Sequence, residues 1–273
     1  MNSRESLQAR TISDFGDQWS KYTDNEGWYG SIDLFDDIIR PLLSTKDLKN
    51  TYVAEIGSGT GRIVSMLLNA GVNHIYAIEP SPGAFAALKK NIEKTGGAKK
   101  ITALNAAGDR WVAEQKLDYV FSIGVLHHVP DPKPAVETAY TALRRGGHFF
   151  IWLYGYEGNE LYLKIIEPFR KVTARLPHFL LRFLVELMYV ALIVYENLSK
   201  YFRLPFQSYL KNVFWPLDPD NRRLVIYDQL NPAYAKYYKK KEAVALLEDS
   251  GFKNIKAHHR HGYSWSVIGQ KPL

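Results

Sequence analysis

A glycine-rich run and two acidic residues in the first half of the chain form a candidate binding motif. Glu55 begins the sequence Glu-Ile-Gly-Ser-Gly-Thr-Gly, which ends at Gly61. Glycines permit a tight turn and let a ligand approach the backbone without meeting a Cβ atom. Eighteen residues after Gly61, Glu79 follows an apolar run, where a carboxylate can accept hydrogen bonds from both hydroxyls of a ribose. The loop and the acid together predict a nucleoside-binding site.

Two details of the sequence distinguish between the nucleoside-containing ligands that such a loop can bind. The dinucleotide motif G-x-G-x-x-G has a small residue at its sixth position, whereas this chain has Arg62 there. Glu55 would repel a pyrophosphate but would attract the cationic amino-acid and sulfonium groups of S-adenosylmethionine. The sequence therefore favours S-adenosylmethionine, and a nicotinamide-dependent reductase is the disfavoured alternative.

Four segments, in order, resemble those of the class I S-adenosylmethionine-dependent methyltransferases. The first motif of that family, E/D-x-G-x-G-x-G, matches residues 55–61, and Glu79 matches the acid that ends its second strand. Residues 122–132 resemble its fourth-strand segment, and residues 143–147 resemble the turn before its fifth strand. The resemblance covers roughly residues 50–155 and 235–270. It implies S-adenosylmethionine as the cofactor and a small-molecule methyltransferase as the function.

The resemblance also implies a set of cofactor-binding residues. The family often places an aspartate after strand three to hold the adenine amino group, and here Asn105 and Asp109 are both candidates for that contact. The predicted cofactor-binding residues are Glu55, Gly57, Ser58, Gly59, Gly61, Glu79, Pro80, Asn105, Asp109 and Gly124.

Candidate catalytic groups follow the predicted fourth and fifth strands. Methyl transfer is an in-line displacement that depends mainly on holding nucleophile and methyl group aligned, so a general base is optional. His127 and His128 would suit a hydroxyl or ammonium acceptor, although packing against the cofactor or capping a turn is the leading interpretation. Tyr154 either lines the acceptor pocket or packs in the core. No metal site is expected at His258–His261, because consecutive strand residues face opposite sides.

The elements that must position these residues alternate between apolar runs and amphipathic stretches from about residue 51 to 154, which is typical of βαβ units. We predict a doubly wound α/β fold with a seven-stranded, mostly parallel sheet. The predicted strands are Tyr52–Ile56, His74–Ile78, Ile101–Asn105, Asp118–Ile123, His148–Tyr154, Phe252–Ala257 and Ser264–Gln270. The predicted helices are Ser31–Leu43, Gly61–Asn69, Pro82–Lys94, Pro134–Arg144 and Lys240–Ser250, with Ser81 as a cap and Gly71, Gly96 and Gly146 as stop signals.

Four segments follow from this pattern. Residues 1–50 form an aromatic segment with Phe15, Trp19, Tyr22, Trp28 and Tyr29 and a helix, and residues 51–155 form the cofactor-binding core. Residues 156–235 form a mainly helical cap inserted after strand five, and residues 236–273 complete the core. Residues 159–215 combine long aliphatic stretches with eight lysines and arginines against four glutamates. The cap is expected to complete the core, to cover a pocket for a large acceptor, to contact a membrane interface peripherally, or to form a homo-oligomer.

Charge and composition limit the kinds of acceptor molecule that we expect. The formal net charge of +7 belongs entirely to residues 151–273, which indicates an anionic partner for the second half. We expect a small anionic or partly hydrophobic metabolite, with Tyr234, Tyr237 and Lys239–Lys241 contacting its anionic group. An RNA-modifying methyltransferase and a cofactor-binding protein without transferase activity are alternatives, although nucleic acid is not expected because no RNA-binding module is evident. The chain has no cysteine and no signal-peptide pattern at its start, so a cytoplasmic location is expected.

Overall fold

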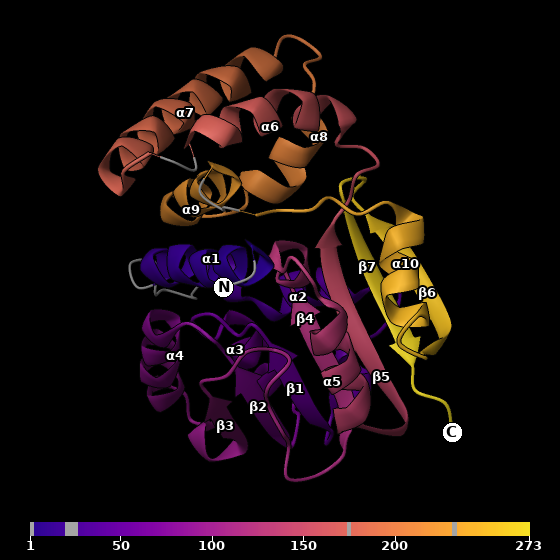
Figure 1. Ribbon diagram of the computed structural model, residues 1–273. Helices are drawn as coiled ribbons and strands as arrows, with labels where there is room; N and C mark the ends of the chain where they lie inside the picture. Colours follow the sequence, from indigo (N-terminus) through magenta and orange to yellow (C-terminus); the bar gives the residue numbers. More distant parts are fainter. Residues whose placement is uncertain (1–2, 20–26, 174–175, 231–233) are drawn as a thin grey trace.

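The sheet at the centre of the molecule has the predicted doubly wound arrangement. The computed structural model describes residues 3–19, 27–173, 176–230 and 234–273 (Figure 1). In this part of the chain seven strands form one sheet in the order β3-β2-β1-β4-β5-β7-β6. Strands β1 to β5 are parallel, and β7 runs antiparallel to both β5 and β6. Their bounds are β1 Tyr52–Ile56, β2 His74–Ile78, β3 Ile101–Leu104, β4 Leu117–Ile123, β5 Leu143–Tyr154, β6 Lys253–Arg260 and β7 Ser264–Gln270.

Helices cover both faces of this sheet because successive strand residues point to opposite sides. Val53 of β1 packs in one hydrophobic cluster with α2, α3 and α4, whereas its neighbour Ala54 packs in a second cluster with α5 and α10. These helices are α2 Ile32–Ile39, α3 Arg62–Asn69, α4 Pro82–Lys94, α5 Lys133–Ala142 and α10 Lys240–Glu248. Helix α4 has the predicted cap, since the Ser81 side chain accepts a hydrogen bond from the Ala84 amide.

Some predicted boundaries were wrong by a few residues. Helix α2 ends at Ile39 instead of Leu43, because the residue before a proline, here Arg40, disfavours helical backbone. Helix α5 ends at Ala142, and β5 begins at once, so Gly146 lies inside the strand instead of stopping the helix. Strand β6 continues to Arg260, three residues beyond the predicted end.

Residues 160–230 form a helical unit beyond the carboxyl ends of the parallel strands (Figure 1). Its elements are α6 Glu160–Thr173, α7 His178–Ser199, α8 Gln207–Tyr209, the π-helical turn η5 Leu210–Phe214 and α9 Pro219–Leu230. They enclose a hydrophobic cluster separate from the two beside the sheet, formed around Leu181, Val185, Phe214 and Leu230. The cap therefore has a core of its own.

The N-terminal helix α1 (Ser3–Trp19) was not predicted from the sequence. It lies between the core and the cap in Figure 1 and packs on α4, where a Cβ atom on Gly83 would stand 3.2 Å from the Gly16 carbonyl oxygen. Two glycines thus permit a close helix crossing. Of the aromatic segment, Tyr22 and the side chains of Phe15 and Trp19 lie outside the described part, whereas Trp28 and Tyr29 belong to the 3-10 turn η1 (Gly27–Gly30).

Candidate functional site

A cavity of about 1060 Å³ lies between the carboxyl ends of the parallel strands and the cap. Its lining comes from the loop after β1, from the segments after β2 to β5, from α1 and from the cap helices. Ligand sites in proteins usually measure about 300–1,000 Å³, so this cavity has room for a cofactor and a second molecule together.

The loop after β1 turns away from the sheet with glycine backbone angles. Gly57 has a φ of +79°, and a Cβ atom there would lie 2.4 Å from Cγ2 of Val125. The amides of Gly57 and Ser58 both donate to the Ile78 carbonyl oxygen, at 2.8 and 2.9 Å. The loop is therefore fixed against the end of β2. Gly61, with a φ of +93°, forms the N-cap of α3. It is one of the predicted cofactor-binding residues, but it does not line the cavity.

Glu79 connects this loop to the next helix. One carboxylate oxygen accepts from the Gly59 amide at 2.9 Å, and the other accepts from the Ser81 amide at 2.8 Å. Burial raises the pKa of Glu79, while the two backbone hydrogen bonds oppose that rise. The carboxylate lines the cavity at the end of β2, which is the position expected for a ribose contact.

Glu55 is buried beneath the loop with an unsatisfied oxygen. Its side chain is 1% exposed, and Oε2 has no hydrogen-bond partner among the described residues. Burial raises the pKa of Glu55 to about 8, opposed by the positive charge of Arg62. A buried carboxylate oxygen without a partner is costly unless a ligand supplies one. The ammonium group of S-adenosylmethionine fits this requirement.

The structure separates the two candidates for the adenine contact. Asn105 is exposed, does not line the cavity, and donates from Nδ2 to the Glu79 carbonyl oxygen at 2.8 Å. In this structure it stabilises the turn after β2 instead of lining the cavity. Asp109 lines the cavity beside Gly108. The remaining predicted residues Ser58, Gly59, Pro80 and Gly124 also line it.

The two histidines after β4 occupy different environments. His127 is fully buried, does not line the cavity, and stacks on Tyr154 with ring centroids 3.8 Å apart. It therefore packs in this structure and does not face the cavity, and its role as a base stays a prediction. His128 lines the cavity, and its Nδ1 lies 2.9 Å from the Tyr234 carbonyl oxygen. Burial lowers the pKa of His128 to about 4, so the ring is neutral near pH 7.

Three tyrosines surround one amide side chain at the cap end of the cavity. Gln229 of α9 accepts from the hydroxyls of Tyr162 at 2.6 Å and Tyr237 at 3.1 Å, and its Nε2 donates to the Tyr154 hydroxyl at 3.2 Å. The buried Arg170 donates from Nε to the main-chain carbonyl oxygen of Gln229 at 2.9 Å. All but Arg170 line the cavity. This network gives the cap end a fixed, hydroxyl-rich aromatic wall.

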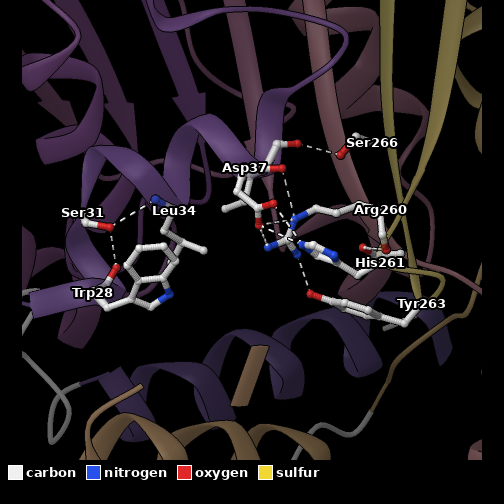
Figure 2. A network of polar contacts seen from close by, with 10 residues as sticks. Trp28, Ser31, Leu34, Asp37, Arg260, His261, Tyr263 and Ser266 are labelled. Atoms are coloured by element: carbon white, nitrogen blue, oxygen red, sulfur yellow. Dashed lines mark hydrogen bonds and ion pairs between the residues drawn. The ribbon is translucent and has the colours of Figure 1, made fainter. Parts of the chain in front are cut away.

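A second network connects α2 to the hairpin between β6 and β7 (Figure 2). Asp37 accepts from Arg260 and, at 3.0 Å, contacts His261, while Arg260 also donates to the Tyr263 hydroxyl. Arg260 is 4% exposed, so its charge is neutralised by Asp37 inside the protein. These four residues line the cavity, and no local motif marked them in the sequence.

Comparisons with known proteins agree with this geometry. A family model described as a methyltransferase domain matches residues 54–151. Residues 54–151 form a class I S-adenosylmethionine-dependent methyltransferase domain. A tRNA U34 carboxymethyltransferase of Alteromonas mediterranea is 30% identical over 117 residues, which cover 41% of this chain and 35% of that protein. The chain thus matches little more than a third of that relative's length.

Solved methyltransferase structures share the fold across most of the chain. The Burkholderia thailandensis 1,6-didemethyltoxoflavin-N1-methyltransferase, with bound 1,6-didemethyltoxoflavin and S-adenosylhomocysteine, covers all 100% of this chain and 92% of its own, at 13% identity and a TM-score of 0.56. Human N-acetylserotonin methyltransferase in complex with S-adenosylmethionine covers 84% of this chain and 50% of its own, at 12% identity and a TM-score of 0.50. The predicted methyltransferase fold is confirmed, and the reductase alternative is set aside.

The lining of the cavity has no surplus of positive charge that would favour an anion. Lys239–Lys241 lie at the start of α10 and do not line the cavity, so their predicted contact with an anionic acceptor was wrong. The described lining residues include six carboxyl side chains, Asp37, Glu55, Glu79, Asp109, Asp131 and Asp228, and three guanidinium groups, Arg62, Arg110 and Arg260. Each guanidinium already has a partner, respectively the Tyr29 ring, Asp109 and Asp37. The lining therefore offers no surplus of positive charge.

Proposed function

We propose that this chain transfers the methyl group of S-adenosylmethionine to a small, uncharged, partly hydrophobic acceptor through a hydroxyl or amine. The proposal rests on one observation, which is that the same cavity contains both the cofactor-binding acids and the aromatic wall around Gln229. Glu55 and Glu79 lie at one end, and the wall around Gln229 lies at the other. Tyrosine rings offer apolar surface, and their hydroxyls with the Gln229 amide offer hydrogen bonds, a combination suited to a neutral acceptor.

Catalysis in this arrangement rests mainly on position. The wall around Gln229 and the cap helices that line the cavity align the acceptor with the methyl group and displace water from it. The Nδ1 atom of His128 faces a carbonyl oxygen, which only accepts, so the proton of the neutral ring belongs on Nδ1. Nε2 is then the ring atom that can accept a hydrogen bond from the acceptor and orient it, whereas a ring with a pKa of about 4 holds a transferred proton poorly near pH 7.

A second candidate acceptor is tRNA, which the printed name of the Alteromonas relative supports. The net positive charge of residues 151–273 is consistent with phosphate binding. Against it, the described lining of the whole cavity has six carboxyl side chains and three guanidinium groups, a balance that does not favour phosphates.

The test is transfer of a labelled methyl group from S-adenosylmethionine to three acceptor panels: neutral hydroxylated or amine compounds with aromatic or aliphatic parts, their carboxylated or phosphorylated counterparts, and total tRNA. We expect transfer in the first panel only. Gln229→Leu should raise the acceptor KM at least about tenfold while S-adenosylmethionine binding stays unchanged, because a buried hydrogen-bond network is lost.

Other outcomes would overturn the proposal. Transfer to tRNA alone, with steep salt dependence, would establish the RNA candidate. Binding of S-adenosylmethionine without transfer to any panel would favour the cofactor-binding protein without activity. Preference for the anionic panel would contradict the charge argument.

A further inference from the structure

The outward side of helix α7 is apolar, although it faces solvent. Phe183, Leu187, Val190 and Val194 follow one another at helical spacing and are each more than half exposed. The opposite side of the same helix is apolar too, since Leu181 is buried in the cap cluster. A helix at a protein surface normally presents polar residues to water, so the outward side of α7 is suited to a partner.

Helix α6 extends this surface. Leu161, Ile165 and Val172 are spaced along one side of α6 and are exposed. Figure 1 shows α6 and α7 in the cap layer farthest from the sheet. We call the seven side chains Leu161, Ile165, Val172, Phe183, Leu187, Val190 and Val194 the cap face. Seven exposed apolar side chains on two helices of the same layer differ from the singly scattered apolar residues normal for a protein surface.

Cations and aromatic rings border the cap face. Exposed basic residues lie along its two helices and just beyond α7: Lys164, Lys171, Arg182, Lys200 and Arg203. The acids of this region are Glu160, Glu167, Glu186 and Glu196, four against seven lysines and arginines in residues 160–204, and Glu186 is paired with Arg223 of α9 at 2.7 Å. Exposed rings stand at both ends of α7, Phe179 in its first turn and Tyr201 just after its last residue, the latter 82% exposed. Apolar residues with flanking cations and terminal aromatics are typical of helices that lie in a membrane interface.

We propose that the cap face docks on an anionic lipid bilayer, with α6 and α7 lying in the headgroup region. Among the described residues no helix is long and apolar enough to cross a membrane, and α7 is held on its inner side by the cap cluster. A second copy of the chain fits less well, because a symmetric contact would bring the same cationic borders together. Anionic headgroups neutralise those borders.

Docking would bring the lipid close to the acceptor site. Met188, Leu192 and Tyr195 on the inner side of α7 line the cavity. An α-helix with its side chains is about 10–12 Å across, so the cap end of the cavity would lie roughly one helix diameter from the headgroups. Docking itself does not require methyl transfer, so its test is independent of the proposed function.

The experiment is flotation of the full chain with vesicles of phosphatidylcholine alone or mixed with phosphatidylglycerol. We expect binding to the mixed vesicles, weak binding to phosphatidylcholine, and release at high salt. Replacing Phe183, Leu187, Val190 and Val194 with serine should lower the partition coefficient at least about tenfold. Replacing Lys164, Lys171, Lys200 and Arg203 with glutamine should lower it about fivefold for each cation removed.

Val112→Ser is the control, because Val112 is an apolar residue that is 85% exposed and belongs to the segment between β3 and β4, not to the cap helices. It should bind vesicles like the native chain. Circular dichroism and the unfolding midpoint establish that each variant is folded. Equal flotation of the native chain and the serine variant, or no flotation of either, would overturn the proposal. A dimer that the serine substitutions dissociate, without vesicle binding, would assign the face to self-association.

Discussion

Two buried acids at the cofactor end of the cavity are satisfied in different ways. Both oxygens of Glu79 accept backbone amides, so this side chain organises the loop before any ligand arrives. Glu55 keeps an unpaired oxygen in the described structure and has a pKa near 8. Glu79 is thus a prearranged acceptor of hydrogen bonds, whereas Glu55 awaits a positive charge.

Binding of S-adenosylmethionine should release a proton from Glu55. Near pH 7 the carboxyl is mostly protonated in the free chain, and a cationic ligand favours its ionised form. Calorimetry at pH 7 in buffers of different ionisation enthalpy should show the release of up to about one proton per ligand. Glu55→Gln should abolish the release and weaken binding about tenfold or more. An unchanged proton balance in the native chain would contradict this role.

The same shift affects stability. Because burial raises the Glu55 pKa from 4.5 to about 8, the folded chain holds a proton that the unfolded chain loses first. Stability of the ligand-free chain should therefore fall as pH rises through that interval. Urea unfolding across this range should show a shallower decline for Glu55→Gln, and identical slopes would argue against the shift.

His127 provides a prediction of opposite sign. Both ring nitrogens are buried without hydrogen-bond partners in the described chain, and burial holds the pKa well below 6.5. Below pH 6.5 the His127 ring is protonated in the unfolded chain but stays neutral in the folded chain. Acid should therefore destabilise the folded protein below pH 6.5. His127→Phe keeps a similar shape and should add about 1 kcal/mol to the free energy of unfolding, with a larger gain at pH 5 than at pH 8.

Its counterpart is His128→Ala, which should lower kcat because His128 lines the cavity and His127 does not. Unfolding by urea and methyl transfer measured on both variants separate the roles. Equal loss of activity in a stably folded His127→Phe variant would place His127 in the chemistry.

At the scale of elements, the site depends on contacts between segments far apart in the chain. The pair of Asp37 and Arg260 attaches α2 to the hairpin of β6 and β7, across 223 residues of sequence. Ser266 adds a hydrogen bond of 2.8 Å to the Ile38 carbonyl oxygen. Together these contacts hold one wall of the cavity against the sheet.

Asp37→Ala should therefore destabilise the chain strongly. It leaves the buried Arg260 guanidinium without its carboxylate, at a cost of about 3 kcal/mol. Asp36→Ala on the same helix is the control, because its partner Arg40 is 59% exposed and the loss should stay below about 1 kcal/mol. A double variant that adds Arg260→Met should recover part of the loss in urea unfolding. Equal effects of the two single substitutions would refute the difference in burial.

At the scale of the whole molecule, charge and cavity are separated. The excess of positive charge belongs to residues 151–273, yet the cavity is lined by more carboxyl than guanidinium groups. Most of that excess belongs to residues 236–273, which hold eight lysines and arginines against three acids, while the cap residues 156–235 hold ten against eight. The positive charge of residues 151–273 is therefore relevant to the partners of the outer surface, whereas the lining of the cavity is relevant to which acceptor is methylated.

Ligand binding should stabilise the chain as a whole. At a concentration of 100 times Kd, S-adenosylmethionine should add about 2.7 kcal/mol and raise Tm by roughly 5–10 °C for a protein of this size. Glu79→Ala should remove most of this shift, because it deletes the carboxylate that organises the loop. Thermal unfolding by fluorescence measures both, and a full shift in the variant would show that Glu79 is dispensable.

Features encoded by neighbouring residues could be predicted from the sequence. The glycine loop, β1, β2, β7, α4 and its Ser81 cap follow from turn chemistry and hydrophobic periodicity, which act within a few residues. Helix α1 escaped prediction because its sequence is polar, and its place depends on packing against α4.

Only the tertiary structure decided how the site is completed. It placed Asp109 and not Asn105 in the cavity, and it buried His127 while exposing His128 to the cavity. It also brought Asp37 to Arg260 and left Lys239–Lys241 outside. The sequence by itself determined the cofactor loop and the alternation of strands and helices, because both depend on local backbone preferences and hydrophobic periodicity. The acceptor site depends on side chains from distant segments, whose meeting is set by strand register and helix packing.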